Sequence, residues 1–361
     1  MTRILATGAC LPGDPITNAE LERLAGPIPD DVLATIQVER RHWVADPVTG
    51  AHRSGTSAMA ATAARRALEA AQLEPADVDL LVLSTSSPEY PLPAAVTLVQ
   101  EHLGIPRCAT IELRSGCAGA IAALDIAHLY LSRGSHQRAV VMGVEVISPL
   151  LVPLYQGLDP DSVRLRDRMA VYTFGDGAAA AVLEAGPPED VVVTAIGSVG
   201  GHERPGMRIV GGGTHAPLRE QLAAARPVEL QLDLAGSAER TARVIGMALD
   251  DIEARAGVQL ASIALCILPE GNAGYLADDS GEAHPGWVSL RELVFENLAD
   301  VGATGSAAVL LALDAAWRTG RVNPGDRVLL LGIETSKWLY GAMLLDWSAP
   351  APVERAGPAG Q

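Results

Sequence analysis

The sequence predicts an α/β protein made of two related halves that stack into five layers, α/β/α/β/α. The first observation is a repeat, because the segments ALD and VVMGVE recur 189 residues later as ALD and LLLGIE, with Gly143 matching Gly332. A helix-then-strand unit is therefore repeated in register. The second observation is that the strand-like runs are apolar throughout, which is typical of strands buried on both faces between helices. Strand-end loops of two such halves are expected to meet at a pseudo-twofold axis. The repeated segments are ALD at 123–125 and 312–314, VVMGVE at 140–145 and LLLGIE at 329–334.

Each half also carries the same series of helix, strand and polar turn upstream of the repeated unit. In the first half, helical periodicity, an apolar run and a serine-rich turn predict these elements at 57–71, 80–83 and 84–87. In the second half, the matching patterns stand at 238–256, 263–268 and 269–272. The series supports one architecture used twice.

The two halves join near GPPED at 186–190, where glycine and prolines interrupt both patterns. We therefore expect an N-terminal half at 1–186 that holds the nucleophile, and a C-terminal half at 187–347. The tail at 348–361 is rich in Ala, Pro and Gly and is expected to be disordered.

The composition of the 361 residues is that of a cytoplasmic enzyme. A net charge of −16 argues against nucleic acid as a partner, because phosphates would be repelled. Apolar runs are too short for a membrane span, and the first residues do not form a signal peptide. The cysteines are scattered, so neither a metal site nor a disulfide framework is expected, and no motif for a resident cofactor is present. They are Cys10, Cys108, Cys117 and Cys266.

Cys117 is the candidate nucleophile, because it stands among small residues directly before an Ala/Leu-rich helix. At a helix N-terminus, the unpaired N–H groups and the positive end of the dipole favour a thiolate and can hold an oxyanion. A buried structural cysteine is the alternative that this residue alone leaves open. The 189-residue offset carries Cys117 onto Ser306, so the second half has a small-residue turn in the equivalent place.

These residues resemble the type III β-ketoacyl-ACP synthases of the thiolase superfamily over almost the whole chain. The resemblance implies a thiolase-like fold, a homodimer, an acyl-thioester on Cys117 and an acyl carrier protein as partner. It also implies a substrate tunnel to which the partner subunit contributes near Leu92, where the family usually has Phe. The matching segments are ATGACLP at 6–12, ERR at 39–41, SPEYPLP at 87–93, the Cys117 segment, FGDGA at 174–178 and 302–347.

The sequence departs from this family at the two residues that assist condensation. Condensing members have a His where this chain has Glu270, and an Asn where it has Ala303. A carboxylate would repel an enolate and alanine donates no hydrogen bond, so decarboxylative condensation is not expected. The chain then resembles divergent acyltransferases of specialised metabolism, which act in polyketide or antibiotic-type biosynthesis. They transfer an acyl group from Cys to an alcohol, an amine or a second carrier. A decarboxylating synthase and a catalytically silent scaffold subunit remain the alternatives.

Three residues could act as the general base for such a transfer. Glu334 ends a strand that the family directs toward the active site, although its repeat partner Glu145 shows that a structural carboxylate is equally possible. Glu270 occupies the position of the missing His, where burial could raise the pKa of the carboxyl group. His202 titrates near neutral pH, although a solvated loop histidine is the ordinary explanation.

The same resemblance indicates which molecule donates the acyl group and which residues contact the substrate. Coenzyme A users carry a Trp that stacks on adenine where this chain has Val32, so the phosphopantetheine arm of a carrier protein is the expected acyl donor, and CoA stays open as the alternative. Leu92, Ala303 and Ser306 are the expected substrate-binding positions. The arginines at 164, 166 and 168 form either a carrier-docking patch or a solvated loop. The acyl group, the acceptor and the pathway stay open.

Overall fold

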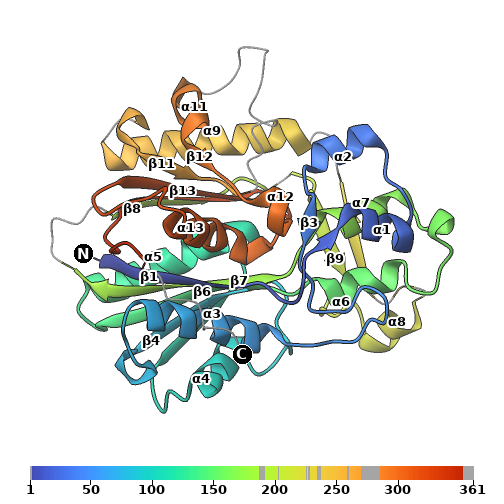
Figure 1. Ribbon diagram of the computed structural model, residues 1–361, viewed down its shortest axis with the longest axis horizontal. Coiled ribbons are helices and arrows are strands. Elements are labelled where there is room, and N and C mark those ends of the chain that lie inside the picture. Colours follow the sequence, from blue (N-terminus) through green and yellow to red (C-terminus); the bar gives the residue numbers. More distant parts are fainter. Residues whose placement is uncertain are drawn as a thin grey trace, which may run out of the picture.

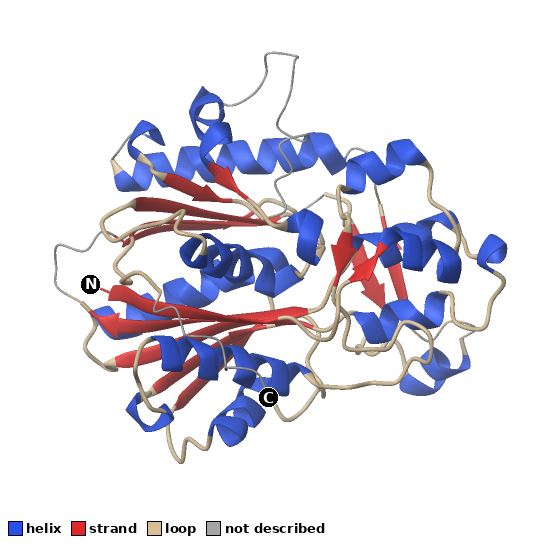
Figure 2. Cartoon of the chain, viewed as in Figure 1, coloured by secondary structure: helices blue, strands red, loops and turns tan. Residues whose placement is uncertain are grey.

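Two five-stranded mixed sheets form the body of the computed structural model (Figures 1 and 2). The structure describes residues 2–186, 192–201, 203–224, 226, 228–233, 237–257, 260–269 and 285–352. The first sheet contains β1 (Thr2–Cys10), β4 (Leu80–Ser84), β5 (Ala109–Leu113), β6 (Arg138–Glu145) and β7 (Gly177–Ala185). The second contains β8 (Val192–Ser198), β11 (Leu265–Ile267), β12 (Val294–Phe295), β13 (Arg327–Glu334) and β14 (Leu339–Asp346).

The two sheets have the same topology, which confirms the duplication. Their strand orders are β5-β4-β6-β7-β1 and β12-β11-β13-β14-β8. In each sheet the first three strands pair in parallel, and the fourth strand pairs antiparallel with both of its neighbours. β6 and β13 have the same length and stand 189 residues apart, as the repeat predicted. Single helical turns at Gly116–Ala118 and Gly305–Ala307 share this offset.

Helices complete the five predicted layers (Figure 1). α5 (Gly119–Ser132) and α13 (Ala308–Arg318) lie between the sheets, where they share one apolar core with the inner faces of both. α3 (Thr56–Ala70) and α4 (Ala95–Leu103) cover the outer face of the first sheet. α9 (Ser237–Ala256) covers the outer face of the second, with α11 (Pro285–Leu290) beside it.

The apolar strands are buried on both faces, which explains why the sequence shows no alternation. In β13, Val328 and Leu330 pack toward the central helices, whereas Leu329 and Leu331 pack toward α9. β4 divides its side chains between the two cores of the first sheet in the same way. Successive side chains point to opposite faces, so a strand between two helical layers needs apolar residues at every position.

A lateral group of elements closes one end of the sheets, on the right in Figure 1. Two residues of the family-like segments hold this group in place, because Asp176 joins it to the end of β7 and Arg41 joins elements within it. Asp176 accepts hydrogen bonds from the backbone N–H groups of Val44, Ile147 and Ser148, and burial raises the pKa of its carboxyl group. Arg41 donates to the carbonyls of Ile16 and Tyr172, and burial lowers its pKa to about 10. The group comprises α1 (Asn18–Ala25), α2 (Asp30–Ile36), α6 (Ser148–Leu151), α7 (Leu165–Thr173), α8 (Leu218–Ala223), α12 (Leu298–Val301), the pair β2 (Ile16–Thr17) and β3 (Arg40–Arg41), and the pair β9 (Met207–Val210) and β10 (Glu229–Leu232).

The predicted boundary between the two halves, at residues 186 and 187, adjoins 187–191, which lie outside the described residues. The first sheet is built from segments before this boundary and the second from segments after it.

The tail was predicted to be disordered from residue 348, but its first residues pack on the body. The Ser348 hydroxyl donates to the Ile4 carbonyl, Ala349 is buried, and the Pro350 carbonyl accepts from the Trp317 indole. These contacts satisfy polar groups that a disordered chain would leave to water. Residues 353–361 lie outside the described part of the chain.

None of the helices in the described residues is both long and apolar enough to span a membrane.

Candidate active site

Cys117 lies in the helical turn Gly116–Ala118, between the end of β5 and the start of α5. The turn fits only because its neighbours are small: Gly116 has φ +50°, and a Cβ atom at Gly119 would lie 2.0 Å from the Ser84 hydroxyl. The side chain of Cys117 is partly buried and reaches a cavity of about 380 Å³. The predicted position of Cys117 before a helix is therefore confirmed, and its role as nucleophile stays a prediction.

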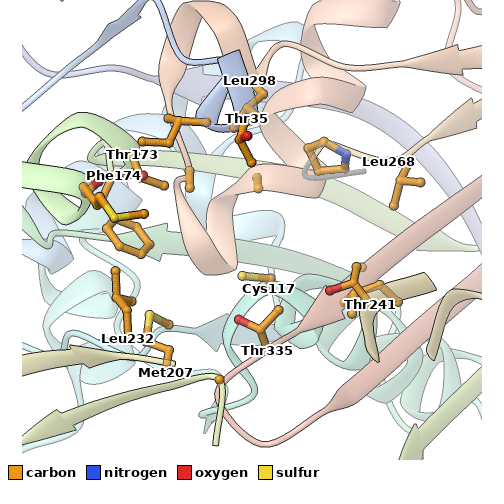
Figure 3. A pocket seen from close by; sticks show the side chains of 18 of the residues that line it. Thr35, Cys117, Thr173, Phe174, Met207, Leu232, Thr241, Leu268, Leu298 and Thr335 are labelled. Carbon is orange, nitrogen blue, oxygen red and sulfur yellow. Dashed lines mark hydrogen bonds between the residues drawn. The ribbon is translucent and has the colours of Figure 1, made fainter. Parts of the chain in front are cut away.

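The cavity lies between the second half of the chain and the lateral group, with walls from α2, α7, α9, β9, β10 and the ends of β11 and β13. Figure 3 shows Cys117 and Thr335 near the middle of its lining, with Met207 and Leu232 on one side and Thr241 on the other. Most lining side chains are apolar, and Asp31 is the charged residue among the described ones. Such a wall favours an apolar ligand.

Glu334 is buried behind Cys117 and bonded to backbone groups. Its Oε2 accepts the Cys117 N–H at 2.7 Å, and its Oε1 accepts the Ser336 N–H at 2.6 Å. The sequence led us to expect unpaired N–H groups at this helix N-terminus that could hold an oxyanion. For the Cys117 N–H the expectation was wrong, because the carboxylate of Glu334, 217 positions away, accepts its hydrogen bond.

Glu145 makes the equivalent contact in the other direction. Its Oε2 accepts the Ser306 N–H at 3.2 Å, and its other oxygen accepts the Ser86 N–H at 3.0 Å. Burial raises the pKa of this carboxyl group, and the hydrogen bonds from Ser87, Ser306 and Ser86 oppose the rise. Each half therefore ends its central strand with a glutamate that binds the turn of the other half.

Ser306 is fully buried between the halves and is not among the residues that line the cavity. Its hydroxyl donates to the Gly116 carbonyl at 3.1 Å, directly before the nucleophile. We predicted substrate binding for Ser306, and the contact instead makes it a support for the Cys117 turn.

Ala303 lines the same cavity as Cys117, as the sequence suggested. Its backbone N–H donates to the Thr173 carbonyl, and its own carbonyl accepts from the Gly175 N–H. The residue therefore presents a methyl group to the cavity while its backbone polar groups are already bonded. Ala303 cannot replace the hydrogen-bond donor that an asparagine would supply.

The other two candidate bases, Glu270 and His202, lie outside the described residues. Pro269, directly before Glu270, lines the cavity. Both roles remain predictions.

Leu92 and the arginine segment lie away from the cavity of this chain. Leu92 is 86% exposed and is not in the described lining, and its contribution to the tunnel of a second copy stays a prediction. Arg164 pairs with Asp167 and Glu229, and Arg166 pairs with Glu229. The Arg168 guanidinium donates to backbone carbonyls of the lateral group. The segment therefore holds α7 to β10 and is not an open basic patch.

Sequence reasoning missed the four hydroxyl side chains in the described lining, which are Thr35, Thr173, Thr241 and Thr335. Thr335 directly follows the candidate base Glu334, so its place beside the site could have been inferred from the sequence. Thr241 lies on α9, and no local pattern distinguishes it from other helical threonines.

Comparisons with known proteins agree with the fold. The model of 3-oxoacyl-[acyl-carrier-protein] synthase III matches residues 111–200, and the model of its C-terminal part matches residues 289–347. β-Ketoacyl-[acyl-carrier-protein] synthase III of Methylococcus capsulatus is 30% identical over 91% of this chain and 94% of its own length. β-Ketoacyl-[acyl-carrier-protein] synthase III 3 of Streptomyces coelicolor is 31% identical over 98% of this chain and 100% of its own.

Solved structures give the same architecture. AbyA1, a tetronic acid condensing enzyme, is 25% identical and superposes with a TM-score of 0.82 over 96% of this chain and 100% of its own. 3-Oxoacyl-[acyl-carrier-protein] synthase III of Aquifex aeolicus is 24% identical, with a TM-score of 0.77 over 96% of this chain and 100% of its own, which supports the fold.

Proposed function

Because the chain belongs to the 3-oxoacyl-[acyl-carrier-protein] synthase III family of the thiolase superfamily, we propose that it is an acyltransferase that works without carbon–carbon condensation. In the loading step, the Cys117 sulfur bonds to the acyl carbon of a carrier thioester, and the carrier thiol leaves with a proton. In the transfer step, an alcohol, amine or carrier thiol bonds to that carbon. The Cys117 thiol then leaves, and the proton of the acceptor passes through a base to the sulfur.

The observation that carries this proposal is the environment of Ala303. Decarboxylation of a malonyl group creates an enolate, which needs hydrogen-bond donors beside the nucleophile. Ala303 faces the cavity with a methyl group, and its N–H is bonded to Thr173. Acyl transfer needs no enolate, so it remains possible in this site.

The lining of the cavity supports an apolar acyl group. None of its described residues is a cation, and the charged one, Asp31, would repel a substrate carboxylate. A malonyl or similar carboxyl-bearing group therefore finds no counter-ion among the described residues. Branched or aromatic acyl groups match the methionine, leucine and phenylalanine side chains there.

The position of α2 supports a carrier protein as the donor. Val32 lines the cavity together with Asp31 and Thr35 of the same helix. Valine offers no ring for stacking on adenine, whereas the pantetheine arm is common to both donors. The relatives are named for acyl carrier protein, and the likeness to a tetronic acid condensing enzyme supports a role in polyketide-type biosynthesis.

A decarboxylating β-ketoacyl synthase is the second candidate, favoured by the names of the relatives. The purified chain would be incubated with acyl-carrier thioesters, with the matching acyl-CoA esters, and with malonyl-carrier in a parallel reaction. We expect an acylated protein and no release of carbon dioxide from malonyl-carrier. Carbon dioxide with a β-keto product would replace this proposal with the condensing one. No acylation by any donor would leave the scaffold role.

The base is assigned by measuring loading and discharge separately. A variant that lacks the base should accept acyl on Cys117 and release it at least about tenfold more slowly, because loading uses the thiol whereas transfer needs a deprotonated acceptor. The variants are Glu270→Gln, Glu334→Gln and His202→Ala, assayed by quenched-flow mass spectrometry. If all three discharge at the wild-type rate, none of these residues is the base.

Leu92 tests the proposed homodimer through its substrate range. If Leu92 of one copy enters the tunnel of the other, Leu92→Phe should slow transfer of bulky acyl groups more than of acetyl, by about 1–3 kcal/mol from overpacking. Leu158→Phe is the control, because Leu158 is also an exposed leucine and is not in the cavity lining. Equal effects on large and small acyl groups would show that Leu92 does not contact the substrate.

A further inference from the structure

The two glutamates that end β6 and β13 form a reciprocal pair between the halves. Glu334 accepts the N–H of Cys117, and Glu145 accepts the N–H of Ser306. The donor residues are equivalent under the 189-residue offset, and so are the two glutamates. The pair is therefore a symmetric feature of the duplicated fold, with a thiol on one side only.

The glycines before the two donors show that the carboxylates are built into the turns. Gly116 and Gly305 have φ of +50° and +49°, which side-chain-bearing residues rarely adopt. A Cβ atom at Gly116 would lie 1.6 Å from Glu334 Oε2, and one at Gly305 would lie 2.6 Å from Glu145 Oε2. Each carboxylate thus occupies the space that a side chain would otherwise fill.

The contact has an electrostatic consequence on the Cys117 side only. An N–H that already donates to a carboxylate at 2.7 Å is not available to a second anion. The carboxylate charge also opposes the formation of a thiolate nearby, and burial keeps water from screening it. The benefit that a helix N-terminus gives to a thiolate is therefore partly cancelled.

We propose that Glu334 is a positioning residue that fixes the Cys117 turn and keeps the Cys117 thiol protonated in the resting enzyme. The inference rests on the proposed function only in taking Cys117 as the nucleophile. It assigns Glu334 a role in restraining the nucleophile rather than in deprotonating the acceptor.

Other charged groups near Cys117 enter the design of the test. In the described lining, Asp31 of α2 is the charged residue. Glu145 lies beyond the hydrogen bond between Ser306 and Gly116, where Ser86, Ser87 and Ser306 bind it. Its substitution removes an equivalent carboxylate without touching the Cys117 N–H.

The experiment is the rate of alkylation of Cys117 by iodoacetamide as a function of pH, followed by peptide mass spectrometry. This measurement needs no acyl substrate, so a negative result would reject the proposed role of Glu334 without testing the proposed acyl transfer. Glu334→Gln keeps the shape of the side chain and removes the charge. Its midpoint should move to lower pH by about half to one unit, which is about three- to tenfold faster alkylation below the wild-type midpoint.

Glu145→Gln is the matched control and should leave the midpoint where it is. An unchanged or higher midpoint in Glu334→Gln would overturn the proposal, and so would an equal shift in Glu145→Gln. If Glu334→Gln does not fold, Glu334→Asp takes its place, because it withdraws the charge by one methylene group. A smaller shift in the same direction is then expected, and no shift rejects the proposal.

Discussion

Replacing Cys117 by alanine should abolish acyl labelling and reduce acyl transfer by at least about 10³-fold. Among the described residues that line the cavity, Cys117 is the cysteine, and both halves hold its turn in place. The measurement is intact-protein and peptide mass spectrometry after incubation with a panel of acyl-carrier thioesters, together with the rate of transfer.

The other three cysteines provide the control. Burial raises the pKa of the Cys10 and Cys108 thiols, and it raises that of Cys266 to about 12, so none of them supplies much thiolate at neutral pH. Cys108→Ala should therefore label and turn over like the wild type. Acyl mass on Cys10, Cys108 or Cys266, or undiminished transfer by Cys117→Ala, would contradict the assignment of the nucleophile.

Gly116→Ala should lower both the stability and the activity of the protein. The positive φ costs about 1 kcal/mol, and the new methyl group would displace the Glu334 carboxylate from the Cys117 N–H, which costs a further 1–3 kcal/mol or so. We expect the free energy of unfolding to fall by about 2–4 kcal/mol. Transfer should fall by at least about 10²-fold, because the sulfur moves with the turn. Denaturant unfolding and the transfer rate measure the two effects.

Two further glycines separate strain from loss of the contact. Gly134 has φ +69° with open space around it, so Gly134→Ala should cost about 1 kcal/mol and leave transfer unchanged. Gly305→Ala disturbs the equivalent turn of the other half, so it should lower stability and retain more activity than Gly116→Ala. If Gly116→Ala behaves like Gly134→Ala, the Glu334 contact contributes nothing measurable.

The sequence predicted the duplicated architecture because the repeat is a matter of order and register. β6 and β13 could be recognised as equivalent by comparing their sequences. Both are apolar throughout, because strands that are buried on both faces need apolar residues at every position. Cys117 could be located because a turn packed this closely before a helix admits only small residues. Ala303 could be recognised as a lost donor because the resemblance to the condensing synthases implies an asparagine at its position.

The contacts of these residues were decided by the packing of segments far apart in the chain. Glu334 was a candidate base in the sequence, and only the docking of the two halves shows its carboxylate on the Cys117 N–H. The sequence left the arginine segment as either a basic patch or a solvated loop, and in the structure β10 places Glu229 against Arg164 and Arg166. In both cases the sequence determined which charged groups the chain has. The tertiary structure determined which partners they meet, because hydrogen bonds and ion pairs depend on distances of a few ångströms that no local pattern encodes.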